Sequence, residues 1–170
     1  CELYFDQVRV SKDNLIGNLG EGFKIALSTL DGGRIGIASQ ALGIAQASLE
    51  NSIKYSKDRK QFGKPIANNQ AIQFKLADMG MEIEAARLLI YKAASEKDRK
   101  LNFSSSASMA KVYASEVAMR ASTECVQIHG GYGYIKESGV ERLMRDAKIT
   151  QIYEGTSEIQ RIVIARDLLK

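Results

Sequence analysis

Residues 70–98 read QAIQFKLADMGMEIEAARLLIYKAASEKD and contain the clearest pattern in the chain. Apolar residues recur there at alternating steps of four and three, at Ile72, Leu76, Met79, Ile83, Ala86, Ile90 and Ala93. This spacing places all seven side chains on one face of an α-helix, over about six turns. Other helices must cover a stripe of that length, so the segment predicts a helical bundle.

The residues before this segment predict another long helix. A short helix is expected at 21–30, and Asp31 is placed to cap the helix that follows it. The stripe of this second helix comprises Ile35, Ala38, Leu42, Ala45 and Leu49. We expect it to end near 59–62, because basic residues fill its last turn, Gly63 favours a left-handed conformation and Pro65 follows.

Three more helices are predicted after residue 98. The longest covers 104–129, where Gly130 and Gly131 stop it, and shorter ones cover 138–148 and 156–170. The apolar positions of the longest are Ala110, Val112, Val117, Met119, Ala121, Val126 and Ile128. With one proline and no second strand pattern, the predicted fold class is all-α, a four-helix bundle with short appended helices.

The first residues of the chain have a different pattern. Leu3, Phe5, Val8 and Val10 predict one short β-strand at 3–10, in a chain that begins with Cys1 rather than Met. A single strand cannot pair with itself, so we expect its partners in a missing upstream domain. The predicted division is 1–18, the end of an upstream β domain and a linker, and 19–170, the helical bundle domain.

Composition and charge argue against several classes of protein. The 24 basic residues are scattered among 20 acidic ones, so the net charge of +4 does not predict a nucleic-acid surface. No apolar run reaches the length of a transmembrane helix. Cys1 and Cys125 are far apart, which indicates a reducing compartment without a disulfide framework. His129 is the only histidine, so no multi-histidine metal site is expected and His129 is interpreted as a packing or polar-contact residue.

The segment IYEGTSEIQR at 152–161 places one carboxylate on a turn that is bounded by glycine. The Glu154 side chain can project from such a turn into a cleft, and Gly155 allows another molecule to approach the backbone. A structural interpretation is equally open, in which Ser157 and Gln160 form a capping box and Glu154 is a solvated acid. This motif alone does not decide between the two.

Four other segments accompany it in a recognisable order. The set comprises LDGGRIGIASQALGIAQ at 30–46, YSKDRKQFGKPI at 55–66, QAIQFKLADM at 70–79, VQIHGGYGY at 126–134 and MRDAKITQIYEGTSEIQR at 144–161. Together they resemble the acyl-CoA dehydrogenases in order and spacing over nearly the whole chain. The likeness is strongest to short-chain, butyryl-CoA type members and extends only to their C-terminal helical part.

The resemblance implies α,β-dehydrogenation of a short-chain acyl-CoA to the trans-2-enoyl-CoA, in which a base takes the pro-R α proton and flavin N5 takes the β hydride. Glu154 is the implied base, and its backbone N–H is one of the donors to the thioester oxygen. Related branches carry the base at the position of Gly33, where this chain has no carboxylate. Asp31, Arg34 and Gly155 are the implied substrate contacts, with an internal ion pair of Arg34 as the alternative.

FAD is the cofactor that the resemblance implies. The corresponding residues are Arg59, Phe62, Gln70, Gln127, Gly130, Gly131, Thr156, Ser157 and Glu158. The first three are implied to contact the pyrophosphate and adenine half of FAD bound mainly by the neighbouring subunit, since an arginine fork suits phosphate and an aromatic ring suits adenine. Gln127, Gly130 and Gly131 are implied to line FAD through the main chain. Thr156, Ser157 and Glu158 are implied to cap the final helix and to contact FAD.

The resemblance further implies a homotetramer built as a dimer of dimers, and an electron-transferring flavoprotein as electron acceptor. The compartment would be the cytoplasm in a bacterium or the mitochondrial matrix in a eukaryote. An alternative function is a catalytically inactive helical assembly or binding module of the same scaffold, against which the presence of Glu154 argues. The piece alone is not expected to turn over substrate, because most of the flavin site is implied to lie upstream.

Overall fold

The computed structural model describes residues 2–170, so Cys1 and the predictions that involve it lie outside the described residues. The elements in chain order are η1 (Lys12–Asn14), α1 (Gly22–Asp58), β1 (Lys60–Gln61), β2 (Lys64–Pro65), η2 (Ile66–Asn68), α2 (Gln70–Asp98), α3 (Ser104–His129), α4 (Gly131–Tyr134), η3 (Lys136–Ser138), α5 (Val140–Thr150) and α6 (Ser157–Leu168). No helix among residues 2–170 is long and apolar enough to cross a membrane.

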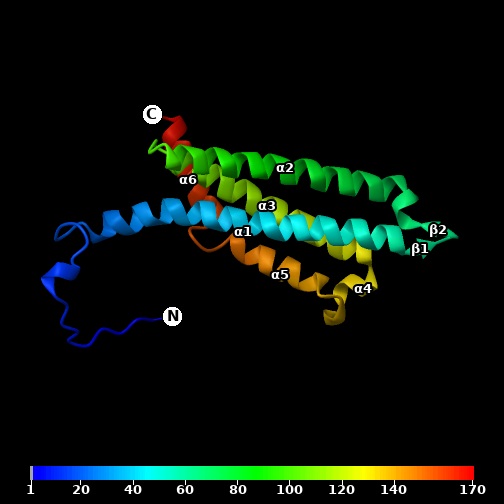
Figure 1. Ribbon diagram of the computed structural model, residues 1–170, viewed down its shortest axis with the longest axis horizontal. Coiled ribbons are helices and arrows are strands. Elements are labelled where there is room, and N and C mark those ends of the chain that lie inside the picture. The colour runs from blue at the N-terminus through cyan, green and yellow to red at the C-terminus, as the bar shows by residue number, and fades with distance from the viewer. Residues whose placement is uncertain (1) are drawn as a thin grey trace.

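The long helices α1, α2 and α3 lie side by side, and α5 completes the bundle (Figure 1). Helix α3 is central, because it contacts α1, α2, α5 and α6. Helix α6 packs on α3 as an appended element, and α4 is a single turn between α3 and α5. The predicted all-α fold is therefore confirmed.

The core confirms the predicted stripes. On α2, Met79, Ile83, Ala86, Ile90 and Ala93 are buried. Where α1 meets α3 the buried residues are mostly alanines, which comprise Ala38, Ala41, Ala45, Ala107, Ala110, Ala114, Ala118 and Ala121. Small side chains allow two helix axes to approach closely, because the interaxial distance depends on the side chains at the contact. Any long polar side chain on this face of α3 is therefore unusual.

The glycine pair at 32–33 does not interrupt α1. The sequence predicted a helix at 21–30 and a second one capped by Asp31, but a single α-helix runs through both. Each glycine inside a helix costs roughly 1 kcal/mol relative to alanine. The contacts that α1 makes with α3 and α5 offset this cost. Asp31 is thus an interior helical residue that pairs with Arg34, one turn further on.

Helix α1 ends at Asp58, slightly before the predicted boundary at 59–62, and a small antiparallel hairpin follows. Phe62 and Gly63 form its turn with φ of 51° and 80°. Two successive positive φ angles are the mark of a type I′ hairpin turn. The sequence did not predict this hairpin, because strands of two residues are too short to show an alternating pattern.

The later helix boundaries are close to those predicted. Helix α3 begins and ends at the predicted residues, and Gly130 follows it with φ of 60°. Helix α5 is displaced by two residues from the predicted 138–148, and α6 begins at Ser157 rather than at Thr156, which is its N-cap. Caps and glycine stops are local signals, so they locate helix ends well.

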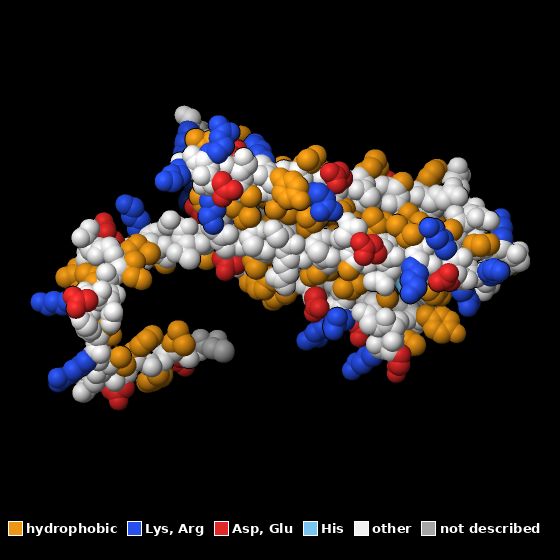
Figure 2. Space-filling model, in the orientation of Figure 1, with side chains coloured by type: hydrophobic (Ala, Val, Ile, Leu, Met, Phe, Trp, Pro, Cys, Tyr) orange, Lys and Arg blue, Asp and Glu red, His pale blue; other side chains and the backbone are white. Residues whose placement is uncertain are grey.

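The strand predicted at 3–10 does not form within residues 2–170, which contain no partner strand for it. Residues 2–10 form no strand and lie apart from the bundle, with apolar side chains such as Tyr4 and Phe5 exposed (Figures 1 and 2). A strand needs a partner to accept its backbone hydrogen bonds, and within residues 2–170 none pairs with this segment. The division into 1–18 and 19–170 remains a prediction.

Candidate active site

Glu154 lies in the short connection between α5 and α6. Its φ is 55° and that of Gly155 is 88°, so two successive residues are left-handed. A positive φ is uncommon for a residue other than glycine and costs on the order of 1 kcal/mol or more. Strain of this kind persists only where neighbouring groups hold the backbone, and it concentrates at functional sites.

Two fully buried side chains hold the turn from the bundle side. The Gln160 Nε2 group donates to the carbonyl oxygens of Glu154 and Gly155 at 2.9 and 3.0 Å. The Lys111 Nζ group donates to the Gly155 carbonyl at 2.8 Å. The main chain on both sides of the Glu154–Gly155 peptide is therefore fixed to α3 and α6.

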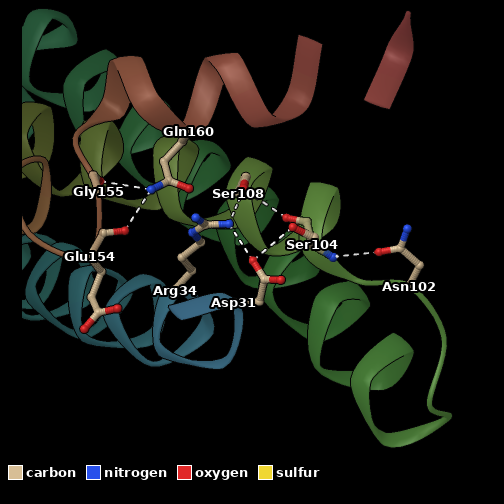
Figure 3. A network of polar contacts seen from close by, with 8 residues as sticks. All are labelled: Asp31, Arg34, Asn102, Ser104, Ser108, Glu154, Gly155 and Gln160. Atoms are coloured by element: carbon tan, nitrogen blue, oxygen red, sulfur yellow. Dashed lines mark hydrogen bonds and ion pairs between the residues drawn. The ribbon is translucent and has the colours of Figure 1, made fainter. Parts of the chain in front are cut away.

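The capping box that the sequence left open does not form. Thr156 is the N-cap of α6, and its Oγ1 accepts from the Ile159 N–H at 3.5 Å. Gln160 instead turns its amide back toward the Glu154 turn (Figure 3). The glutamine that resembled part of a cap is a tertiary anchor for the carboxylate-bearing turn.

The Glu154 carboxylate points toward α1 (Figure 3). Gly33 is the residue of α1 that lies against it. A Cβ atom on Gly33 would lie 2.5 Å from Glu154 Oε2, so the carboxylate occupies the space that any other residue would fill. Oε2 is buried and has no hydrogen-bond partner among residues 2–170. A buried carboxylate oxygen without a partner is a candidate proton acceptor. The neighbouring Tyr153 hydroxyl donates to Gln40 Oε1 at 2.7 Å, which ties the turn to α1.

The predicted substrate residues Asp31 and Arg34 form a buried polar network beside this turn (Figure 3). Arg34 NH1 donates to Asp31 Oδ1 at 2.6 Å and to Ser108 Oγ at 3.3 Å, and Ser104 Oγ donates to the same Asp31 oxygen at 2.9 Å. The internal ion pair that the sequence left open is thus present. The Arg34 Nε–H is buried and lacks an acceptor in the described part of the chain, so the network has one donor to spare.

Lys111 is a member of the site that the sequence interpretation missed. Burial lowers the pKa of its ammonium to about 8, helped by repulsion from Arg34 and opposed by attraction to Glu154 and Glu158. A sequence signal existed, because Lys111 is four residues after Ala107 and three before Ala114, on the buried face of α3. A lysine on a stripe of buried alanines indicates a specific partner.

The residues after Gly155 surround the same turn. Ser157 is buried and its Oγ has no partner within residues 2–170. Glu158 is exposed, and its own backbone N–H followed by the Thr156 hydroxyl lowers the pKa of its carboxyl group. The structure therefore brings Thr156, Ser157 and Glu158 together with Glu154.

The other six predicted cofactor residues lie at the opposite end of α1, near the hairpin. A cavity of about 520 Å³ there is lined by Arg59, Gly130 and Gly131 among others. The Arg59 guanidinium lies over the Tyr132 ring, 5.8 Å from its centroid. Phe62 is 98% exposed at the hairpin tip, and Gln70 and Gln127 are exposed outside the cavity lining.

His129 contributes to one wall of this cavity. Its ring stacks on Tyr55 at a centroid distance of 4.2 Å, and Nδ1–H donates to the Cys125 carbonyl at 2.8 Å. The interpretation of His129 as a packing and polar-contact residue is therefore confirmed. Among residues 2–170, no three or more His, Cys, Asp or Glu side chains are grouped to hold a metal ion.

The two groups of predicted residues are far apart. Gly33, which contacts Glu154, and Arg59 are separated by about 26 residues, which corresponds to roughly 39 Å along α1. One dinucleotide cannot touch both ends of the helix. The residues predicted to contact FAD therefore fall into two groups, one near each end of α1.

Comparisons with known proteins identify the family of the chain. The family model described as "Acyl-CoA dehydrogenase, C-terminal domain" matches residues 20–169. The structure of butyryl-CoA dehydrogenase from Megasphaera elsdenii is similar with a TM-score of 0.96 and 59% identity, over 98% of this chain and 43% of that chain.

Two curated relatives extend the comparison. The short-chain specific mitochondrial acyl-CoA dehydrogenase of Mus musculus is 57% identical over 170 residues, which cover 100% of this chain and 41% of the relative. The caffeyl-CoA reductase-Etf complex subunit CarC of Acetobacterium woodii is 53% identical over 169 residues, which cover 99% of this chain and 45% of the relative. The chain therefore spans less than half the length of the curated relatives it matches, and it belongs to the acyl-CoA dehydrogenase family as a C-terminal domain of that family.

Proposed function

We propose that this chain is the C-terminal part of an FAD-dependent enzyme that oxidises short-chain acyl-CoA thioesters to trans-2-enoyl-CoA. The observation that carries the proposal is the Glu154 carboxylate, held on a left-handed turn with a buried oxygen that lacks a partner in the described chain. An inactive assembly module would have no use for a strained carboxylate of this kind. The butyryl-CoA and short-chain names of the relatives support the substrate class.

Glu154 acts as the general base. Its carboxylate takes a proton from the α carbon, the electrons of that C–H bond form the new double bond, and a hydride leaves the β carbon. FAD, when bound, supplies the acceptor for this hydride. The backbone N–H of Glu154 donates to the thioester oxygen, where negative charge develops as the proton leaves.

The network on α1 supports the bound acyl-CoA. Asp31 and Ser108 hold the Arg34 guanidinium in place beside the Glu154 turn. Gly155 allows the Gln160 amide to pack against the turn, because a Cβ atom there would lie 2.7 Å from Gln160 Nε2.

The residues at the hairpin end fit an aromatic phosphate-containing group such as FAD. Arg59 offers a fork of donors, Phe62 offers an exposed aromatic face, and no heavy atom lies within 4 Å of where a Cβ would be on Gly130 or Gly131. Because this end is roughly 39 Å from Glu154 along α1, it would hold the adenine half of an FAD that belongs to another subunit. Thr156, Ser157 and Glu158 would contact the subunit's own FAD, which requires at least a dimer.

The assembly and the electron acceptor follow from the same proposal. We infer a homotetramer built as a dimer of dimers, with an electron-transferring flavoprotein as partner, and the Etf complex in the name of the Acetobacterium woodii relative supports that partner. The compartment would be the cytoplasm in a bacterium and the mitochondrial matrix in a eukaryote. The piece alone should not turn over substrate, because the isoalloxazine pocket would lie outside these residues.

The proposed activity can be tested on the full-length protein. Purified enzyme should be yellow, and anaerobic addition of butyryl-CoA should bleach the flavin band. A panel of acyl-CoA substrates from about C4 to C16 would place the fastest bleaching among the short chains if the pocket depth is that of the short-chain relatives. A protein without flavin, or with flavin that no acyl-CoA bleaches, would contradict the proposal in favour of the assembly module.

We expect Gly33→Ala to separate activity from stability. The new methyl group would lie 2.5 Å from Glu154 Oε2, so the carboxylate must move away. A displacement of about 1 Å at a reacting group can reduce a rate about 100-fold, whereas alanine raises helix stability by roughly 1 kcal/mol. Flavin bleaching should therefore slow about 10- to 100-fold, while the melting temperature stays level or rises.

The matched control for this variant is Gly36→Ala, one turn further along α1. No heavy atom lies within 4 Å of where its Cβ would be, so it should raise the melting temperature without slowing flavin bleaching. Equal rates for both alanine variants would show that Gly33 does not set the position of the base.

A further inference from the structure

Lys111 is the largest fully buried side chain of the described chain. It extends from α3 between alanines, and its Nζ reaches the Gly155 carbonyl. No carboxylate among residues 2–170 lies within ion-pair distance of it. An ammonium buried without a paired carboxylate destabilises a fold, so packing alone does not explain this lysine.

Stability does not require the Lys111 contact either. Gln160 already donates to the Gly155 carbonyl at 3.0 Å, so that oxygen would stay paired without the lysine. The ammonium also faces the positive Arg34 guanidinium on α1, and repulsion between the two helps to lower the pKa of Lys111. Its favourable charge partners are Glu154 in the turn and Glu158 on α6.

The position of this contact matters for the base. Gly155 follows Glu154 directly, and the direction of the Glu154 side chain depends on a left-handed φ of 55° that a residue other than glycine does not adopt readily. We infer that Lys111 is a positioning residue, which binds the Gly155 carbonyl so that the strained turn keeps the Glu154 carboxylate aimed at the substrate. This inference rests on the proposed dehydrogenase function, and Lys111 touches neither the substrate nor the reacting atoms.

The test uses the full-length enzyme with FAD bound and the variant Lys111→Met, which keeps the length of the side chain and removes the donor and the charge. Anaerobic stopped-flow bleaching by butyryl-CoA should show a limiting rate roughly 10- to 100-fold below wild type. The substrate dissociation constant from the same titration should stay within about twofold, because the change affects the chemical step. The isotope effect with α-deuterated butyryl-CoA should increase, because removal of the α proton becomes more rate-limiting.

Stability distinguishes positioning from a merely structural role. Lys111→Met should melt at or above the wild-type temperature, since it removes a buried charge and leaves the Gly155 carbonyl paired with Gln160. Lys92→Met is the matched control, because Lys92 is exposed on α2 and pairs only loosely with Glu96 at 4.0 Å. It should leave both the bleaching rate and the isotope effect unchanged.

A Lys111→Met enzyme that bleaches at the wild-type rate with an unchanged isotope effect would overturn the inference. If Lys111→Met does not fold, the test uses Lys111→Arg, which keeps a charged donor. A bleaching rate within about fivefold of wild type in this variant supports the inference, and a rate more than about 100-fold below wild type overturns it. Failure of wild-type enzyme to bleach with any acyl-CoA would instead refute the proposed function, so the two failures are distinguishable.

Discussion

Replacing Glu154 with glutamine should nearly abolish flavin reduction by butyryl-CoA while FAD and substrate still bind. The amide keeps the size and shape of the side chain, and the backbone contacts from Gln160 and Lys111 do not involve the carboxylate. The amide cannot accept the α proton. General base catalysis is typically worth about 10²- to 10⁴-fold, and we expect a loss at or beyond the upper end of that range.

The size of this loss follows from what surrounds the carboxylate. The residue of α1 that faces Glu154 is Gly33, which has no side chain and cannot supply a second base there. Anaerobic bleaching of the full-length enzyme measures the effect, and Glu84→Gln on the exposed face of α2 controls for loss of one negative charge. A near wild-type rate in Glu154→Gln would show that the base lies elsewhere.

Replacing Arg59 with alanine should weaken FAD binding far more than it slows reduction of the FAD that remains. Arg59 lies at the hairpin end, roughly 39 Å along α1 from the residue that faces the base, so it does not reach the reacting atoms. A charge-assisted contact to a phosphate contributes about 1.5 to 3 kcal/mol, which corresponds to an increase of roughly 10- to 100-fold in the FAD dissociation constant. Fluorescence titration of the apoenzyme with FAD measures this constant.

A matched variant makes the Arg59 result specific. Lys57→Ala removes an exposed positive charge from the last turn of α1, two residues before Arg59, and should leave FAD affinity within about twofold if the contact is local. Because the proposal places Arg59 against FAD of another subunit, the Arg59→Ala enzyme should also lose FAD more readily on dilution. Equal FAD affinity in both variants would refute this role.

Local sequence signals located most helices well and failed where contacts were distant. Helix α3 begins and ends as predicted, because its periodicity and the glycines after it are properties of neighbouring residues. The glycine pair in α1 was misinterpreted as a boundary, because packing against α3 and α5 outweighs the roughly 1 kcal/mol cost of each glycine. The strand at 3–10 was predicted from alternation alone, and alternation cannot supply the partner that a strand needs.

The sequence by itself determined the helical stripes, the all-α bundle and the single carboxylate at Glu154 in a turn after α5. Motif resemblance also pointed to Arg59, Gly130 and Gly131, all of which line one cavity in the fold. Only the tertiary structure decided what faces Glu154: Gly33 from α1, Lys111 from α3 and Gln160 from α6. These residues come from three helices far apart in the sequence, and a spacing pattern reports only which side of its own helix a residue occupies, so their meeting depends on how the helices pack.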